Sequence, residues 1–260
     1  MTIFTRECRA RLKSTLIWSA VAVVLAYLSM WKFGNLAATG DSMTQLFASM
    51  PKVLMAFFGM VGLDVNRSDH YFGVVHVFLL AMGGVFAAMA GAGALADEES
   101  DKTADFLLTR PVTRVGVLTQ KLLAVLLQIV VFCVFTVLGS VASYTAETGE
   151  PFPYILPLGM FITMLYFAAL GFGIAALSRR PKRSASLSAM TLLGFYLLGV
   201  LYQSSDALRI LRFVTPFEYA SALRLLNGWH TLYYFGLSLL LTAAFIAAAY
   251  LRYPKRDIMT

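Results

Sequence analysis

Long apolar segments alternate with short polar ones along this chain. A membrane-spanning helix needs about 20 mostly apolar residues, and most of the apolar segments reach that length, the fifth being the shortest. In lipid the backbone must form its hydrogen bonds within each segment, as continuous helices do, and no barrel-like alternation with a period of two is present. The pattern predicts an all-α polytopic membrane protein with six spans, at about 16–33, 72–96, 117–142, 155–177, 187–202 and 232–251.

Composition agrees with a membrane protein whose length leaves little room for a separate soluble domain. Of the 260 residues, 59% are hydrophobic and 13% are charged, compared with about 25% charged residues in soluble domains. Six spans use most of this length, so we expect one transmembrane domain over residues 1–260. The net charge of +7 is spread beside the apolar runs, which argues against nucleic acid binding. Cys8 and Cys133 give no disulfide framework and are expected to be free thiols.

Lys and Arg fall mainly on one side of these spans. Cytoplasmic loops carry an excess of these residues, and 15 of the 21 lie near the termini or the loops after the second and fourth spans. Both termini and the 97–116 and 178–186 loops are therefore predicted to be cytoplasmic. Basic residues before an apolar run also occur in cleaved signal peptides. This run is longer than a typical signal, which favours an uncleaved first helix.

Two further apolar stretches, on the other side of the membrane, are too polar or too interrupted to span it. Residues 41–63 are broken by Pro51, which favours an amphipathic or re-entrant helix. Residues 206–226 have amphipathic helical spacing. Pro216 is expected to break or kink that helix.

A strongly charged block, DEESDKTADFLLTRPVTR, occupies residues 97–114 between the second and third spans. Acidic residues begin it, and carboxylates stabilise the first turn of a helix. A compact Phe-Leu-Leu patch follows, and Pro111 ends the helix. A helix over 97–110 with this pattern suits a groove on a cytoplasmic partner. The alternative is a solvated loop whose leucines dip into the lipid interface.

The same block resembles the cytoplasmic segment of ABC-2 type permeases, the membrane subunits of a class of bacterial ABC transporters. That segment commonly reads as an acidic pair, Gly-Thr, an acidic residue, two leucines and Pro-Val-Ser/Thr-Arg. Here Lys102 stands where Gly is usual, and Asp105 replaces the more frequent Glu. With Phe106 of the apolar patch, the residues that the resemblance assigns to ATPase coupling are Glu98, Glu99, Thr103, Asp105, Leu107, Leu108, Pro111 and Arg114.

The resemblance covers nearly the whole chain. It implies an ABC-2, type V exporter-like permease with six spans in the bacterial cytoplasmic membrane. The 97–110 segment would be a coupling helix seated in a cleft of an ATP-binding subunit, and residues 1–14 an amphipathic segment along the membrane surface. The sequence has no Gly-x-x-x-x-Gly-Lys-Ser/Thr phosphate loop. ATP and Mg are therefore expected in two copies of a separate ATPase, with no cofactor in this chain and a second permease copy or paralogue completing the pathway.

Few ionisable residues lie within the spans. This disfavours an ionic cargo and favours export of a hydrophobic or amphipathic molecule, such as a peptide, a drug or a lipid. Ionisable groups in spans are candidates for function, and His76 is the clear case. The alternative is an interfacial, hydrogen-bonded histidine. Phe195 and Tyr196 are weaker candidates for substrate contact, and no metal site is predicted.

Small residues recur every four positions in the second span. Such rows let helices approach closely, so Gly83, Gly84 and Gly91 are predicted packing positions and the span is predicted to be central. The two rows are Gly83, Ala87 and Gly91, and Gly84, Ala88 and Ala92.

Other classes of function fit the sequence less well. An intramembrane enzyme needs a catalytic set within its spans; neither His-Glu-x-x-His nor Gly-x-Ser-x-Gly occurs, and no catalytic residue is predicted. A channel needs a ring of polar or carbonyl groups at its pore, and no such segment is evident. A sensory or assembly subunit that docks an ATPase without transporting remains an open alternative.

Overall fold

The computed structural model describes residues 3–37, 50–100, 113–178, 183–204, 206–228 and 231–253. Six long helices dominate these residues, and each is long and apolar enough to cross a membrane. No strand occurs in the described ranges. The six are α1 (Ile3–Ala37), α4 (Ser68–Ser100), α6 (Arg114–Thr148), α7 (Ile155–Leu177), α8 (Ser184–Ser204) and α11 (Thr231–Arg252). The predicted all-α fold with six spans is confirmed.

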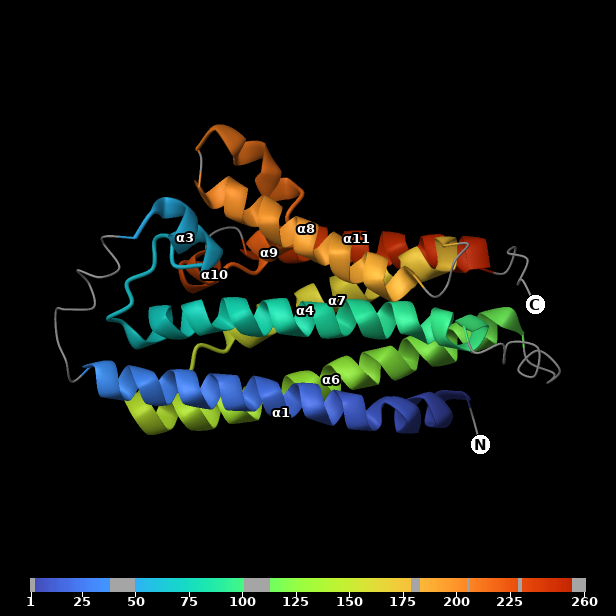
Figure 1. The fold of residues 1–260 in the computed structure, drawn as a ribbon, viewed down its shortest axis with the longest axis horizontal. Coiled ribbons are helices and arrows are strands. Elements are labelled where there is room, and N and C mark those ends of the chain that lie inside the picture. The colour runs from blue at the N-terminus through green and yellow to red at the C-terminus, as the bar shows by residue number, and fades with distance from the viewer. Residues whose placement is uncertain are drawn as a thin grey trace.

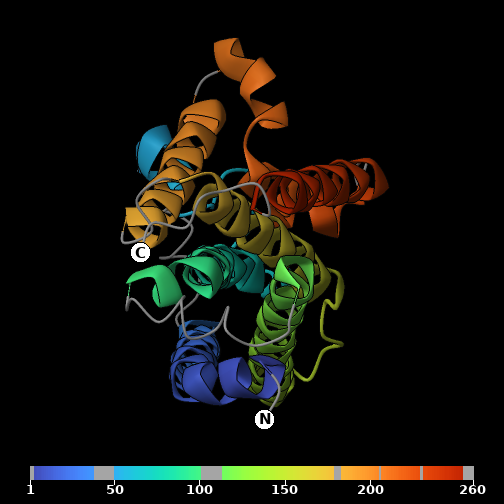
Figure 2. The ribbon, with the colours of Figure 1, turned by 90° about the vertical axis from the view of Figure 1, so that its right-hand side faces the viewer.

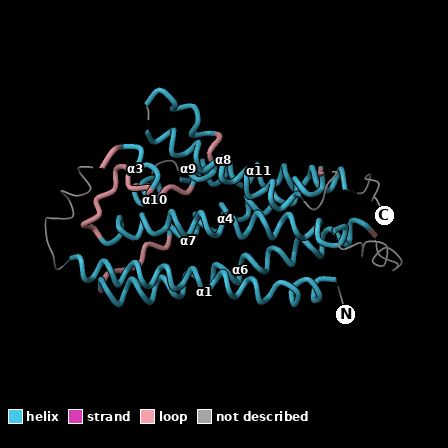
Figure 3. Tube along the Cα trace, in the orientation of Figure 1, coloured by secondary structure: helices cyan, strands magenta, loops and turns pink. Residues whose placement is uncertain are grey.

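The long helices run side by side along the longest axis of the molecule (Figure 1). The first turn of α1 and the last turns of α4 and α11 lie at one end of the bundle, where α6 also begins (Figure 1). We call this end the base. Most of the described loop structure gathers at the opposite end (Figure 3). The described part of the chain therefore begins and ends at the base, in agreement with the prediction that both termini share one side of the membrane.

The fourth and second spans form the centre of the bundle. In α7 and α4, 78% and 67% of the most apolar stretch is buried, compared with 22% in α1 and α8. Helix α7 lies between α4 and α11, and α1 packs along α6; the view along the bundle shows this layering (Figure 2). The outer helices leave their large apolar side chains exposed, as expected for surfaces that face lipid.

Helix boundaries follow local chemistry. Thr113 caps α6, because its Oγ1 accepts a hydrogen bond from the Gly116 backbone N–H at 3.1 Å. At the other end Gly149 adopts φ of 67°, a left-handed conformation that glycine takes without steric cost. Helix α6 is therefore longer at both ends than its apolar pattern predicts.

Short helices cover the end of the bundle opposite the base. Helix α3 (Lys52–Phe57) begins directly after Pro51 and packs against α8. A 3-10 helix, η2 (Asp206–Phe213), is followed by α9 (Pro216–Tyr219) and α10 (Ala222–Leu226). Pro216 occupies the first position of α9, so the predicted break at this residue is confirmed. The part of the predicted 41–63 helix before Met50 lies outside the described residues.

The N-terminal segment is continuous with the first span. Helix α1 has 35 residues and contains no break near residue 14. Its first turns, dark blue, run across the view in Figure 2, whereas the rest of the helix is seen nearly end on. A bend therefore separates the two parts, and the placement of residues 1–14 along the membrane surface stays a prediction.

One predicted boundary is wrong. Asp97, Glu98 and Glu99 were expected in the first turn of a new helix, but α4 continues through Ser100, so they belong to its last turns. The physical reason is local: no Gly or Pro interrupts the chain between Gly93 and Ser100. Carboxylates at a helix C-terminus are unfavourable for the helix dipole. The rest of the predicted 97–110 coupling helix lies outside the described residues.

Candidate functional site

The predicted coupling residues flank one connection at the base. Glu98 and Glu99 lie in the last turn of α4, and the partly buried Arg114 is the first residue of α6. The structure thus brings the two ends of the 101–112 connection to the same end of the bundle (Figure 1). The other predicted coupling residues lie outside the described part of the chain: Thr103, Asp105, Phe106, Leu107, Leu108 and Pro111.

A buried ion pair joins these helix ends to α1. Lys121, two turns into α6, is only 1% exposed. Its ammonium group donates a short hydrogen bond to the backbone carbonyl of Ala94 in α4. The same nitrogen lies 3.6 Å from a carboxylate oxygen of Glu7 in α1. One side chain therefore contacts both α4, which leads into the 101–112 connection, and α1.

Glu7 is the centre of this cluster. Its carboxylate also lies 3.4 Å from Arg6 and 3.6 Å from Arg11. A further link in the same region runs from the Phe4 backbone N–H to the side-chain oxygen of Gln120, at 3.3 Å. Separating buried opposite charges is costly because each ion is left in a poorly solvated environment. The first turns of α1, the end of α4 and the start of α6 are thus held together where the connection begins and ends.

The sequence did not single out this cluster. In the sequence Lys121 is one of many basic residues beside the apolar segments, and Glu7 belongs to no motif. A signal was present, since Glu7 is the one acidic residue in a run that contains Arg6, Arg9 and Arg11. An acid in a basic segment suggests an internal ion pair, but its partner on another helix is visible only in three dimensions.

The small residues of α4 allow its close contact with α7. A Cβ atom added at Gly91 would overlap the carbonyl oxygen of Ala168, and one added at Gly171 would overlap the carbonyl oxygen of Ala88. At Gly83 an added Cβ would lie 3.0 Å from Met164 Sδ, and at Gly84 3.0 Å from Leu192. At Gly91 the atom that an added Cβ would meet belongs to the backbone of α7. At Gly83 and Gly84 it belongs to a side chain, so the three positions limit the approach of neighbouring elements in different ways.

His76 lies buried near the end opposite the base. It is 1% exposed, and its ring lies close to the backbone of Ala220. Within the described residues its Nε2 atom has no hydrogen-bond partner. The ring is therefore buried within the protein, and both interpretations of His76, as a pathway residue and as an interfacial histidine, stay predictions.

The two aromatic candidates contact different elements. The Tyr196 hydroxyl donates to the Phe57 carbonyl of α3, and the ring packs edge-on against Phe217 at 5.3 Å. Phe195 approaches Tyr166 of α7 with ring centroids 6.5 Å apart. In the described ranges no hydrogen bond joins either residue to His76. The three predicted substrate-contacting residues are therefore not linked as one polar site.

A second cluster with a buried carboxyl group lies in α9, near the end of the bundle opposite the base. Glu218 is 4% exposed; it accepts a short hydrogen bond from Gln203 of α8 and lies 3.9 Å from Arg224 of α10. Arg224 in turn stacks over the Tyr234 ring of α11, 4.3 Å from its centroid. Burial raises the pKa of Glu218 above its ordinary value, opposed by Gln203 and Arg224. This cluster holds the short helices on the spans.

The described residues contain no group of three or more His, Cys, Asp and Glu side chains arranged to hold a metal ion. Asp64 and His70 lie close together, but through a 2.9 Å hydrogen bond from the Asp64 backbone N–H to His70 Nδ1. Asp69 instead pairs with Arg67 at 2.7 Å.

The fold and the base cluster define a polytopic, all-helical membrane protein whose spans are joined by buried ions beside one charged connection. A family model for ABC-2 family transporter proteins matches residues 1–258. The chain therefore belongs to the ABC-2 transporter family, as its charged block predicts, and is a multi-pass permease subunit of an ABC transporter. A search of curated proteins finds no match.

Proposed function

We propose that this permease exports a hydrophobic or amphipathic molecule and is driven by a separate ATP-binding subunit that contacts the connection between α4 and α6. Two copies of that subunit would bind ATP and Mg. A second copy of this chain, or a paralogue, would complete the pathway in the bacterial cytoplasmic membrane. The observation that carries the proposal is the Lys121 ion cluster, because it joins both flanks of the connection to α1.

The contacts support a route for movement. Closure of the two ATPases would displace the 101–112 connection together with the end of α4. The buried pair of Lys121 and Glu7 would transfer that displacement to α1, since breaking it leaves buried charges unpaired. The tight crossing at Gly91 would transfer it to α7, the most buried span. Rigid-body movement of packed helices of this kind changes access to a central pathway.

The test is ATPase activity of the permease copurified with its ATP-binding subunit, with and without amphipathic peptides, drugs and lipids. Reversing the charges at Glu98 and Glu99 to Lys is expected to abolish the stimulated activity. Asp64→Lys, an exposed residue at the opposite end, is the matched control and is expected to leave it unchanged. If no nucleotide-binding protein copurifies with the intact chain, or if the reversal has no effect, the proposal is wrong.

A further inference from the structure

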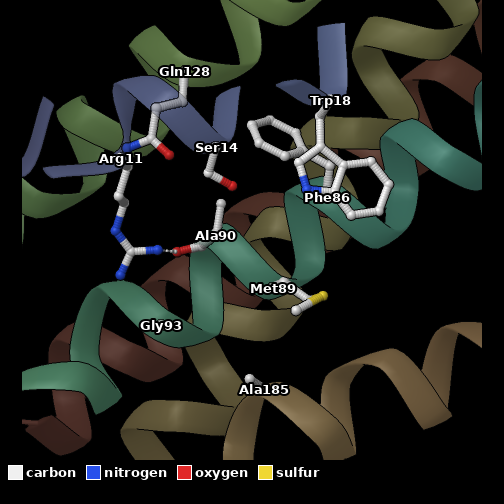
Figure 4. A pocket seen from close by; sticks show the side chains of 9 residues that line it. All are labelled: Arg11, Ser14, Trp18, Phe86, Met89, Ala90, Gly93, Gln128 and Ala185. Carbon is white, nitrogen blue, oxygen red and sulfur yellow. Dashed lines mark hydrogen bonds between the residues drawn. The ribbon is translucent and has the colours of Figure 1, made fainter. Parts of the chain in front are cut away.

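A cavity of about 220 Å³ opens at the base between four spans. Its lining residues come from α1, α4, α6 and the start of α8, as Figure 4 shows. They are Arg11, Ser14, Trp18, Phe86, Met89, Ala90, Gly93, Gln128 and Ala185. The volume is smaller than that of pockets for whole drug-sized ligands, which are about 300–1,000 Å³. It suits one polar group of a larger molecule.

One wall of the cavity is polar and carries hydrogen-bond donors. Gln128 is 5% exposed, and its Nε2 atom has no hydrogen-bond partner among the described residues. The guanidinium of Arg11 also lines the cavity, with one nitrogen 3.5 Å from the Ala90 carbonyl (Figure 4). Amide N–H and guanidinium groups that line one cavity can both donate hydrogen bonds to the oxygens of an anion.

Glu7 does not depend on Arg11 alone for its neutralisation. Glu7, its ion-pair partner, also contacts Arg6 and Lys121. The Glu7 carboxylate therefore keeps two cations if the Arg11 guanidinium turns partly toward the cavity. An arginine has five N–H donors in a planar fork, so it can contact Glu7 and a phosphate oxygen simultaneously.

The remaining wall is apolar and leads out toward lipid. Trp18 and Phe86 form a ring pair with centroids 6.2 Å apart, and Met89 beside them is 43% exposed. Ser14 is also exposed, so the cavity opens between α1 and α4. A molecule with its polar group near Gln128 would leave its hydrocarbon chain along Trp18 and Met89.

The depth of the cavity matches a membrane interface. Ala185 is the second residue of α8, and the basic run that contains Arg179, Arg180, Lys182 and Arg183 immediately precedes that helix. The cavity is therefore level with the end of a span, on the side that Lys and Arg mark as cytoplasmic. Anionic headgroups gather at this depth in the cytoplasmic leaflet.

We propose that this cavity binds the phosphate-bearing headgroup of an anionic amphiphile, which enters sideways from the cytoplasmic leaflet between α1 and α4. Arg11 and Gln128 bind the phosphate, and Trp18, Phe86 and Met89 contact the first part of its chain. The binding depends on the cavity alone. The role of this amphiphile as cargo rests on the proposed function.

Tryptophan fluorescence can measure the binding directly. The chain has three tryptophans, and replacing Trp31 and Trp229 by Phe leaves Trp18 as the reporter. The protein is placed in phosphatidylcholine nanodiscs that contain increasing fractions of phosphatidylglycerol with a nitroxide near the headgroup end of one chain. Quenching of Trp18 is expected at a mole fraction at least five-fold lower than with phosphatidylcholine carrying the same label.

Two pairs of variants separate the cavity from general surface charge. Gln128→Leu is expected to reduce the preference at least three-fold, since it keeps volume and removes the amide. Arg11→Gln is expected to do the same, whereas Arg9→Gln, exposed on the same helix, preserves it. Ala185→Phe fills the cavity and abolishes the preference, and Ser186→Phe, exposed one residue away, preserves it.

Several results would overturn the proposal. Equal quenching by both labelled lipids, or an unchanged preference in both Gln128→Leu and Ala185→Phe, shows that no headgroup site exists. Displacement of the labelled lipid by millimolar inorganic phosphate shows a free-anion site instead.

The cargo role has a separate readout. Phosphatidylglycerol is expected to stimulate the ATPase of the complex about two-fold or more, and Gln128→Leu should lose this stimulation. Failure of the wild-type permease to copurify with an ATPase refutes the proposed function but leaves the quenching result intact. Preferential quenching without stimulation refutes the cargo role.

Discussion

Lys121 of α6 and Glu7 of α1 form a buried ion pair at 3.6 Å, directly beside the backbone of α4. Three spans therefore meet through two side chains at the end of the molecule where the charged connection begins and ends. Because the pair lies in a region of low exposure, its loss cannot be offset fully by water.

Removing either partner is expected to destabilise the bundle and uncouple it. Lys121→Met leaves the Ala94 carbonyl and Glu7 without their ammonium partner, at a cost of about 3 kcal/mol. Thermal unfolding of the permease in detergent should show a lower Tm, and ATPase stimulation in the complex should fall with it. Lys13→Met, which removes an exposed lysine of α1, is expected to change neither.

The double variant distinguishes this pair from two independent effects. Glu7→Gln combined with Lys121→Met should cost less than the sum of the two single changes, by about 1 kcal/mol or more, because residues in contact are not additive. Strict additivity of the two free-energy changes would show that the pair makes no net interaction in the folded protein.

The α4–α7 crossing gives a second prediction. Gly91→Ala introduces a Cβ that overlaps the Ala168 carbonyl oxygen, so the helices must separate, at a cost of about 1–3 kcal/mol. Gly171→Ala has the same effect against Ala88, and the two together should cost less than their sum, since one displacement relieves both overlaps. Thermal unfolding in detergent measures each change.

Gly194 supplies the matched control for this crossing. It is also a helical glycine, but an added Cβ there would meet no atom within 4 Å in the described structure. Gly194→Ala should leave stability unchanged or raise it by up to about 1 kcal/mol, because alanine favours helix. An equal loss of stability at Gly91 and Gly194 would contradict close packing as the cause.

The spans were predictable because burial in lipid leaves a strong, local signal. The range 155–177, bounded by prolines and a basic loop, matches α7. The end of α4 was not predictable from the same rules, since Asp97–Glu99 read equally well as the first turn of a helix or as the last. The hydrophobic pattern fades at Ala96, but the backbone has no residue there that stops a helix.

The candidate site was predictable only in part. The charged block is a local sequence feature and carried the resemblance to the family, whereas the Lys121–Glu7 pair depends on how α1 packs against α6. The cavity is similar. In the sequence Gln128 is one polar residue in an apolar span, and Arg11, which lines the same cavity, is one of four basic residues before the first span. Only the packing of four helices brings them together.

Accessibility from the two sides of the membrane tests the orientation. In a background with Cys8 and Cys133 replaced by Ser, a cysteine at Ser100 should react with a membrane-impermeant maleimide only after the cells are opened. A cysteine at Asn66, exposed at the opposite end, should react in intact cells. Labelling of the Ser100 position from outside would place the connection on the wrong side for an ATPase.

The Glu218 cluster gives a pH prediction. Burial holds the pKa of Glu218 above its ordinary value of 4.5, so the folded state binds this proton more tightly than the unfolded state. The resulting stabilisation is fully present below about pH 4.5 and is lost as the pH rises through the folded-state pKa. Two groups that face the carboxyl oppose this shift: Arg224 of α10 approaches at 3.9 Å, and Gln203 of α8 donates a hydrogen bond.

Thermal unfolding between pH 4.5 and 8 should therefore show a decline in Tm as the pH rises. Glu218→Gln is expected to flatten this decline, because the amide does not titrate. Asp64→Asn, which changes an exposed carboxylate at the same end, should leave the decline in place, and an unchanged pH profile in Glu218→Gln would mean that the carboxyl titrates normally despite its burial.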